Sequence, residues 1–312
     1  MKAIQIREFG SNDSLLYTEL AEPKLNPGEV LVKNKVAGVN PIDWKTCSGG
    51  GAAPFIGDLP FIPGWEFAGT VEQVAEDVTD FSIGDEVFGL IRFPERAGCF
   101  ASYVAAPAEQ ISLRPEGMSI ETAAGLGLAG LTAWQALFDK GNLQASQQVV
   151  VLAGAGGVGH IAIQLAKWMG AKVITTASEE NHAYLLSIGA DIVIDYHNQE
   201  ITDHVNNVDL VIDGIGGDVG IDALRCVKPG GRLVTLPSVT KDEVIAAGKA
   251  MKVTVEPIRV EPNSEQLERL AGLCVDRKLQ LRIADSIPIE ELGKAFDASR
   301  TGRVKGKIIV TI

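Results

Sequence analysis

The sequence predicts an α/β protein of two domains, a barrel-like β domain and a doubly wound parallel sheet. Three observations carry this prediction. Short β-type runs punctuated by Gly and Pro fill the first 115 or so residues, and strands alternate with helices from Gln148 onward. The C-terminal tail then has the pattern of a short strand, a helix and a β-branched strand. These strands do not easily extend the parallel sheet, which already has six strands. We therefore expect a discontinuous first domain, residues 1–118 and 280–312, around a second domain, residues 119–279.

The first domain is predicted from its short strands and the turns between them. Turn residues stand at Asn26-Pro27-Gly28, Pro63-Gly64 and Gly84-Asp85, as in barrels of antiparallel strands. The expected strands are Lys2–Ile6, Glu29–Val36, Gly69–Val74, Glu86–Leu90 and Phe100–Ala105.

The second domain begins with a helix-like stretch, which Ser119 and Thr122 open as a partial capping box. Apolar runs and helical segments then alternate, which favours parallel β-α-β units. The expected strands are Val149–Ala153, Val173–Thr176, Ile192–Ile194, Leu210–Ile212, Arg232–Leu236 and Val253–Ile258. The expected helices begin near Val158, Glu179, Asn198, Val219 and Lys241, and one more covers Ser264–Arg277.

Composition excludes several function classes. The 312 residues carry a net charge of −12, which disfavours binding to nucleic acid or to an anionic membrane surface. The N-terminus lacks the apolar run of a signal peptide, and no stretch reaches the roughly 20 apolar residues of a membrane helix. The four cysteines lie far apart without a C-x-x-C pair, so we expect a reducing, cytoplasmic setting.

A glycine loop indicates a dinucleotide site. Residues 154–159, Gly-Ala-Gly-Gly-Val-Gly, match G-x-G-x-x-G between an apolar strand and an amphipathic helix. The glycines let the backbone approach a pyrophosphate, and the helix N-terminus supplies N–H groups and a positive dipole end. We expect Gly154, Gly156, Gly157 and Val158 to contact the cofactor.

Two later loops lie at carboxyl ends of strands, where ligands bind in such sheets. Gly214 follows the fourth expected strand. Leu236 ends the fifth expected strand, and Ser238 lies in the loop after it. We place all three at the cofactor, although they also fit ordinary connecting loops.

Six stretches together resemble the medium-chain dehydrogenase/reductase superfamily, in its zinc-independent quinone oxidoreductase (zeta-crystallin-like) branch. They cover nearly the whole chain in the order of the family. They are "AGVNPIDWK" at 37–45, "PGWEFAGTV" at 63–71, "GDEVFGL" at 84–90, "AGLTAWQAL" at 129–137, "AGAGGVG" at 153–159 and "GKIIV" at 306–310. The resemblance implies a GroES-like catalytic domain completed by the C-terminus, and a Rossmann cofactor domain.

The resemblance also implies that the chain holds no zinc. Zinc-dependent relatives place a cysteine ligand where this chain has Asn40 and a histidine where it has Trp65, and neither replacement suits a tetrahedral zinc site. Without a Lewis acid, a hydride acceptor that is already electron-poor is favoured, such as a quinone or an α,β-unsaturated carbonyl.

The family motifs point to three residues near the reacting groups. Asn40 matches the asparagine near the nicotinamide, and its amide can donate to a carbonyl or quinone oxygen. Lys45 is a second candidate, as a cationic donor to a developing enolate, although a solvated lysine is an equally good interpretation. Thr132 matches the position that packs beside the nicotinamide, and it also fits a helix threonine bonded to its own backbone.

The second strand of the nucleotide fold ends in Thr-Thr-Ala-Ser without the carboxylate that binds an NAD ribose about 20 residues past the first glycine. We therefore expect NADPH, with Thr176, Ser178 and Tyr196 at its adenosine end. Tyr196 is placed there by resemblance. Asn181 stands where the family often has a lysine, and Glu179 and Glu180 lie close by, so the expected preference is modest.

The sequence thus predicts a metal-free, NADPH-dependent reductase of quinones or enones. Two alternatives stay open: an enoyl-thioester reductase of the same superfamily, and a non-catalytic NADPH-binding sensor or structural protein. We also expect a homodimer, because Lys252–Val260 forms an exposed edge of the second sheet, which relatives pair across a two-fold axis.

Overall fold

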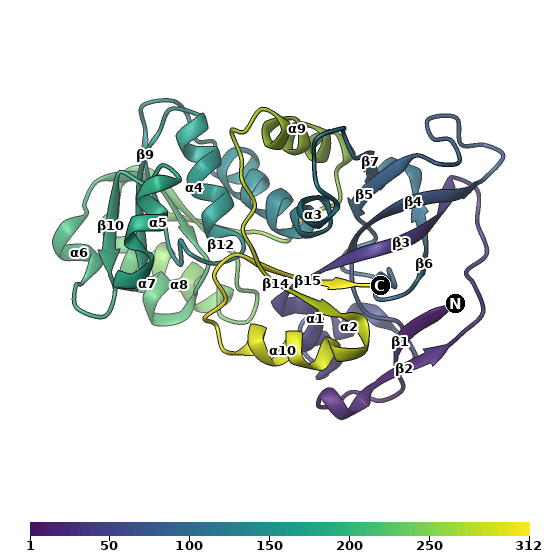
Figure 1. Cartoon of the computed structure of the whole chain (residues 1–312). Helices are drawn as coiled ribbons and strands as arrows, with labels where there is room; N and C mark the ends of the chain where they lie inside the picture. The colour runs from purple at the N-terminus through teal and green to yellow at the C-terminus, as the bar shows by residue number, and fades with distance from the viewer. The chain divides into compact units, whose positions relative to one another are not determined.

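The computed structural model of the protein describes residues 1–312 as two compact units (Figure 1). The first unit consists of Met1–Leu131, Glu261–Arg277 and Leu281–Ile312, and the second of Thr132–Val260 and Lys278–Gln280. These bounds differ from the expected domains because most of helix α3 (Ile120–Trp134) and all of α9 (Ser264–Val275) lie in the first unit. Helix α9 packs on strand β7 (Ile111–Leu113) of that unit. The compact units are not a test of which segments fold as independent domains, so the expected domains, residues 1–118 with 280–312 and residues 119–279, stay a prediction.

The first unit is built on a seven-stranded sheet with the order β14-β15-β3-β4-β5-β7, and β6 pairs with β3 outside this path. A separate hairpin joins β1 to β2. Apolar side chains from β3, β4 and β5, including Val30, Val32, Phe67 and Val87, form the core of the first unit. The strands are β1 (Lys2–Ile6), β2 (Leu15–Glu19), β3 (Glu29–Val39), β4 (Glu66–Val74), β5 (Glu86–Leu90), β6 (Tyr103–Pro107), β7, β14 (Ile283–Pro288) and β15 (Lys307–Thr311).

The C-terminal tail adds two of these strands. Strand β15 runs antiparallel to β3, with Ile308 opposite Val39 and Thr311 opposite Val36, and β14 runs parallel to β15. The tail therefore joins the sheet of the first unit, as the sequence predicts. This register brings Lys307, the first residue of β15, to the end of β3.

Helices of the first unit begin where local signals place them. Pro41 opens α1 (Pro41–Cys47), and the fixed φ of proline suits the first position of a helix. The backbone N–H of Thr122 donates to Ser119 Oγ (3.2 Å) at the start of α3, as the partial capping box predicts. The remaining helices are α2 (Ala53–Ile56), α9 and α10 (Leu292–Arg300).

The second unit contains a six-stranded parallel sheet in the order β10-β9-β8-β11-β12-β13. This is the 3-2-1-4-5-6 order of doubly wound dinucleotide-binding folds, with its switch point between β8 and β11. The strands are β8 (Gln148–Val151), β9 (Lys172–Ala177), β10 (Ile192–Asp195), β11 (Val208–Asp213), β12 (Val227–Thr235) and β13 (Thr254–Pro257). The helices are α4 (Gly159–Trp168), α5 (His182–Ser187), α6 (Ile201–His204), α7 (Gly217–Ala223) and α8 (Lys241–Met251).

Strand β13 is an edge strand, as expected, but only four residues of the β-rich run pair within the sheet. A π-helical turn, Gln135–Lys140, continues α3. No helix in the structure has both the length and the apolar composition that crossing a bilayer requires.

Candidate active site

Asn40 lies at the junction between strand β3 and helix α1. Its backbone is extended (φ −130°, ψ 155°), and Pro41 then turns the chain into the helix. The backbone N–H of Asn40 donates to Asp43 Oδ2 (2.6 Å), which satisfies an amide at the helix start. The Asn40 side chain is 3% exposed, so its amide needs partners inside the protein.

A buried ion pair supplies those partners. Lys307 Nζ lies 2.8 Å from Glu66 Oε1, and both side chains are buried. Asn40 Nδ2 donates to the same oxygen (2.7 Å), and Asn40 Oδ1 accepts a hydrogen bond from Lys307 Nζ. Lys307 also donates to the carbonyl of Val39 (3.2 Å). We call Asn40, Asp43, Glu66 and Lys307 the Asn40 cluster.

The second oxygen of Glu66 reaches helix α3. The backbone N–H of Leu128 donates to Glu66 Oε2 (2.6 Å), so the carboxylate joins the Asn40 cluster to the middle of that helix. Gly38 makes room for it, because a Cβ there would overlap Oε1 and lie 2.6 Å from Cδ of Glu66. A buried carboxylate is tolerated when it is paired and hydrogen-bonded in this way.

Asp43 is the second carboxyl group of the cluster, and it is fully buried. Burial, reinforced by the charge of Glu66, raises the pKa of Asp43 to about 8. Its Oδ1 has no hydrogen-bond partner, which fits a carboxyl group that stays neutral at pH 7. The cluster then balances one positive charge on Lys307 against one negative charge on Glu66.

Lys45, the other predicted catalytic residue, follows Asp43 by two positions in helix α1. Its Nζ is 5.5 Å from the ring centroid of Trp44, a cation–π contact. The same indole contacts the Arg300 guanidinium (5.3 Å) and donates to Ser299 Oγ (3.2 Å), both on helix α10. Lys45 thus contacts the Trp44 ring, whereas Asn40 bonds to Glu66 and Lys307. A catalytic role for Lys45 stays a prediction.

The glycine loop lies between β8 and α4 in the second unit. The N–H of Gly154 donates to the carbonyl of Thr176 (3.0 Å), which ties the loop to the end of β9. A Cβ at Gly154 would overlap Thr175 Oγ1, and a Cβ at Gly159 would overlap the carbonyl of Ala153. These glycines therefore let the chain pack tightly, while Gly156, Gly157 and Val158 stay partly exposed at the start of α4.

Ser178 follows β9 at the same edge of the sheet. Its hydroxyl accepts a hydrogen bond from Asn181 Nδ2 (2.8 Å), so Asn181 turns inward to the serine. The helix expected from Glu179 begins only at His182, after a 3₁₀ turn over Glu179–Asn181. The helix is therefore short, and its dipole gives Ser178 less support for binding an anion than the sequence suggests.

The remaining predicted cofactor residues differ in exposure. Thr176 is buried and its hydroxyl accepts from the N–H of Ala153 (3.2 Å), and Thr132 is buried too. Tyr196 is 57% exposed after β10, beside the ring of His197 (4.3 Å). Gly214 and Ser238 are exposed in the loops after β11 and β12.

A buried carboxylate that sequence reasoning missed organises the last two loops. Asp213, at the end of β11, accepts from the N–H groups of Ile215 (3.0 Å) and Gly216 (2.7 Å) and from Thr235 Oγ1 (2.9 Å). Its carbonyl accepts from the N–H of Leu236 (2.9 Å). A carboxylate that closes an apolar strand just before Gly-x-Gly was the available signal. Glu66 and Lys307 were also missed as members of a site.

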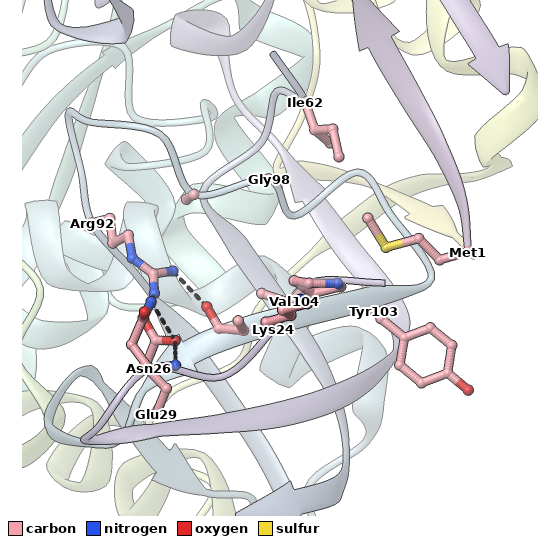
Figure 2. A pocket seen from close by; sticks show the side chains of 12 residues that line it. Met1, Lys24, Asn26, Glu29, Ile62, Arg92, Gly98, Tyr103 and Val104 are labelled. Atoms are coloured by element: carbon pink, nitrogen blue, oxygen red, sulfur yellow. Dashed lines mark hydrogen bonds and ion pairs between the residues drawn. The ribbon is translucent and has the colours of Figure 1, made fainter. Parts of the chain in front are cut away.

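A cavity of about 330 Å³ lies elsewhere in the first unit, and none of the predicted site residues lines it (Figure 2). Figure 2 shows the Arg92 side chain directed toward Glu29, with which it forms an ion pair. Arg92 also donates to the carbonyl of Ala105 (2.5 Å), and Asn26 donates to the other oxygen of Glu29. Arg92 and Glu29 thus neutralise each other in the wall of this cavity. Nowhere in the chain do three His, Cys, Asp or Glu side chains gather so as to hold a metal ion.

Three families match parts of the chain. Residues 26–116 match the alcohol dehydrogenase GroES-like domain, residues 139–219 the C-terminal domain of alanine dehydrogenase/PNT, and residues 188–310 the family described as zinc-binding dehydrogenase. These matches agree with a GroES-like unit and a Rossmann-type parallel sheet in one chain.

Whole-chain relatives are similar along their length. The chain is 34% identical to a 2-methylene-furan-3-one reductase of Solanum lycopersicum, and 32% identical to a chloroplastic NADPH-dependent alkenal/one oxidoreductase of Arabidopsis thaliana. Each match covers 99% of this chain and 79% of the relative. The solved structure of a quinone oxidoreductase from Coxiella burnetii is 38% identical, with a TM-score of 0.96 over 100% of this chain and 99% of the other. The chain belongs to the medium-chain dehydrogenase/reductase superfamily, among its quinone and alkenal oxidoreductases.

Proposed function

We propose that the protein is an NADPH-dependent reductase of quinones or activated alkenes that works without a metal. The observation that carries the proposal is the buried Asn40 amide, which keeps one N–H free of partners where zinc-dependent relatives have a ligand. The names of the relatives support the same substrate class.

The cofactor residues fit a dinucleotide. The glycine loop has no space for side chains at Gly154 and Gly159, and it leads into the first turn of α4. Backbone N–H groups there suit a pyrophosphate. Bound NADPH supplies a hydride, and the reduced substrate takes up one further proton from solvent or a side chain.

Preference for the 2′-phosphate rests on the end of β9. No carboxylate occupies the position after Ala177, where one would repel a phosphate. Asn181 Nδ2 occupies a lone pair of Ser178 Oγ, so the serine proton is free to be donated outward. Glu179 and Glu180 are exposed next to it and reduce the preference.

Asn40 provides the chemical step with a hydrogen-bond donor. When a hydride adds to an enone or a quinone, negative charge develops on the carbonyl oxygen. A preorganised N–H directed at that oxygen stabilises the charge without reorganisation. Since the donor matters most when the charge has formed, it affects turnover more than binding of either partner.

The test is a substrate panel. Purified protein with NADPH is given an ortho-quinone, a short enone and an enoyl thioester, and the loss of nicotinamide absorbance is followed. We expect turnover with the quinone or the enone, and Asn40→Ala should lower kcat by about 10- to 100-fold while the Kd for NADPH stays within about twofold. Faster turnover of the thioester would favour the enoyl reductase alternative. NADPH binding without turnover of any substrate would favour the sensor or structural alternative.

The assembly and the compartment are proposals of the same kind. Strand β13 leaves one side of its backbone unpaired, which makes it a template for a second copy, and we propose an isologous homodimer. All four cysteines are free and three are buried, which suits the cytoplasm.

A further inference from the structure

We propose that Glu66 and Lys307 are positioning residues that hold the Asn40 amide in one orientation, so that only an N–H group is available to the substrate. The proposal rests on the proposed function, because it assigns the residues that make Asn40 a donor. It also specifies the substrate further: the group that meets Asn40 must be a hydrogen-bond acceptor, such as a carbonyl or quinone oxygen.

Each end of the Asn40 amide has a charged partner. Asn40 Nδ2 donates to Glu66 Oε1 (2.7 Å), and Asn40 Oδ1 accepts from Lys307 Nζ. Turning the amide by 180° would place its oxygen against a carboxylate and its NH₂ against an ammonium group. Both hydrogen bonds would become repulsive contacts, and neither charge could turn to water, because the side chains are 0% and 3% exposed.

The two charges are themselves fixed. Glu66 is held at its other oxygen by the N–H of Leu128 (2.6 Å), and Lys307 by the carbonyl of Val39 (3.2 Å). Three adjacent strands of the sheet, β15, β3 and β4, and helix α3 therefore converge on one amide. A fixed orientation of this kind is the preorganisation that transition-state stabilisation requires.

The hydrogen count then identifies the donor. An asparagine amide has two N–H donors and one oxygen with two lone pairs. Glu66 takes one N–H and Lys307 takes the oxygen, so the second hydrogen of Nδ2 is left for a ligand. Without the two charges, either end of the amide could face the substrate, and a carbonyl substrate would lose its donor in a share of the molecules.

A matched reference lies on the same strand. Asn34 is buried on β3, and its Nδ2 donates to the carbonyls of Cys99 (2.8 Å) and Ala101 (3.0 Å). Neutral groups hold this amide, so removing the charges at Glu66 and Lys307 should leave it unchanged.

The first experiment reads the amide directly in protein with ¹⁵N-labelled asparagine, without substrate. Asn40→Ala identifies the Asn40 side-chain signals. In the wild type, one Nδ2 hydrogen should appear downfield because it is bonded to a carboxylate. In Glu66→Gln/Lys307→Met, which removes both charges together and so leaves none unpaired, that signal should move upfield while the Asn34 signals stay in place. Unchanged Asn40 signals would overturn the proposal.

The second experiment tests whether the pair acts through Asn40. We expect Glu66→Gln/Lys307→Met to lower kcat for a quinone or enone about tenfold, with KM for NADPH within about twofold. In the Asn40→Ala background the same two changes should lower kcat by less than about twofold, because the group they orient is gone. Val87→Ala, a core truncation in strand β5, controls for general destabilisation and should leave kcat unchanged.

The outcomes separate the two proposals. If Asn40→Ala lowers kcat but the paired change does not, the positioning role is refuted and the reductase function stands. An equal loss in both backgrounds would show a structural effect, and it would refute the positioning role as well. If no quinone or enone is reduced, the proposed function fails, and the amide signals alone decide the orientation.

Discussion

Lys307→Met should be far more destabilising than an ordinary lysine substitution. The change removes the ammonium group that lies 2.8 Å from Glu66 and leaves a carboxylate with no exposed surface facing an apolar chain. Removing one partner of a buried ion pair costs about 3–5 kcal/mol, because the remaining charge is uncompensated. We expect a loss of free energy of unfolding in that range.

A matched pair on the surface provides the control. Lys33 and Glu72 lie 3.5 Å apart, with side chains 57% and 39% exposed. Water compensates a charge there, so Lys33→Met should cost no more than about 1 kcal/mol. The two variants make the same chemical change in the same unit and differ in burial.

Adding Glu66→Gln to Lys307→Met should restore much of the loss, because no unpaired charge is then left in the interior. Replacement of a whole buried pair is often nearly neutral, so we expect the double variant to lie within about 2 kcal/mol of the wild type. Urea unfolding followed by far-ultraviolet circular dichroism measures all four proteins. If Lys307→Met costs no more than Lys33→Met, the buried pair is solvated in solution and the reasoning fails.

Four further predictions concern the site and the assembly. The ratio of kcat/KM for NADPH to that for NADH should be about ten, as one or two hydrogen bonds from Ser178 would provide, and a preference for NADH would show that Glu179 or Glu180 binds the ribose. Activity should survive a chelator, and stoichiometric zinc whose removal abolishes turnover would contradict the metal-free chemistry. Light scattering should give twice the chain mass of 33.1 kDa, whereas a monomer at micromolar concentration would argue against pairing of β13. Because Asp43 has a pKa of about 8 in the folded chain and 3.8 as its ordinary value, the unfolded state loses this proton first. The free energy of unfolding should therefore fall by up to about 1.4 kcal/mol per pH unit between about pH 4 and 8, and Asp43→Asn should flatten that slope.

Much of the fold could be predicted from local sequence. All six strands of the parallel sheet lie where apolar runs predict them, because each run is bounded by a turn or a helix start. Errors concentrate at ends and at short elements. Ala153 was expected to end β8, but its φ of 56° takes it out of the strand and into the glycine loop. Helix α1 was missed, although Asn-Pro-x-Asp at 40–43 is a helix-start signal.

The candidate site could be predicted only in part, because its partners are far apart in the chain. Lys307 and Glu66 are separated by 241 positions, and they meet only through the register of β15 on β3 and of β3 on β4. A shift of one residue in either pairing would turn these side chains to the other face of the sheet. No local pattern contains that information, so a lysine at the start of a strand looks like a surface residue until the register is known.

The motifs that identify the family acquire a physical reason once they are seen together. "AGVN" supplies Gly38, which leaves space for the Glu66 carboxylate, and Asn40, which bonds to it. "PGWE" supplies that carboxylate, and the stretch beginning at Gly306 supplies the lysine that neutralises it. The glycine-rich part of α3 brings the Leu128 amide to the remaining oxygen. Each motif is unremarkable alone, and each residue type follows from one requirement: a buried carboxylate must be neutralised, fully hydrogen-bonded and given room. The Asn40 amide beside this carboxylate bonds to it through one N–H and keeps its second N–H for a substrate.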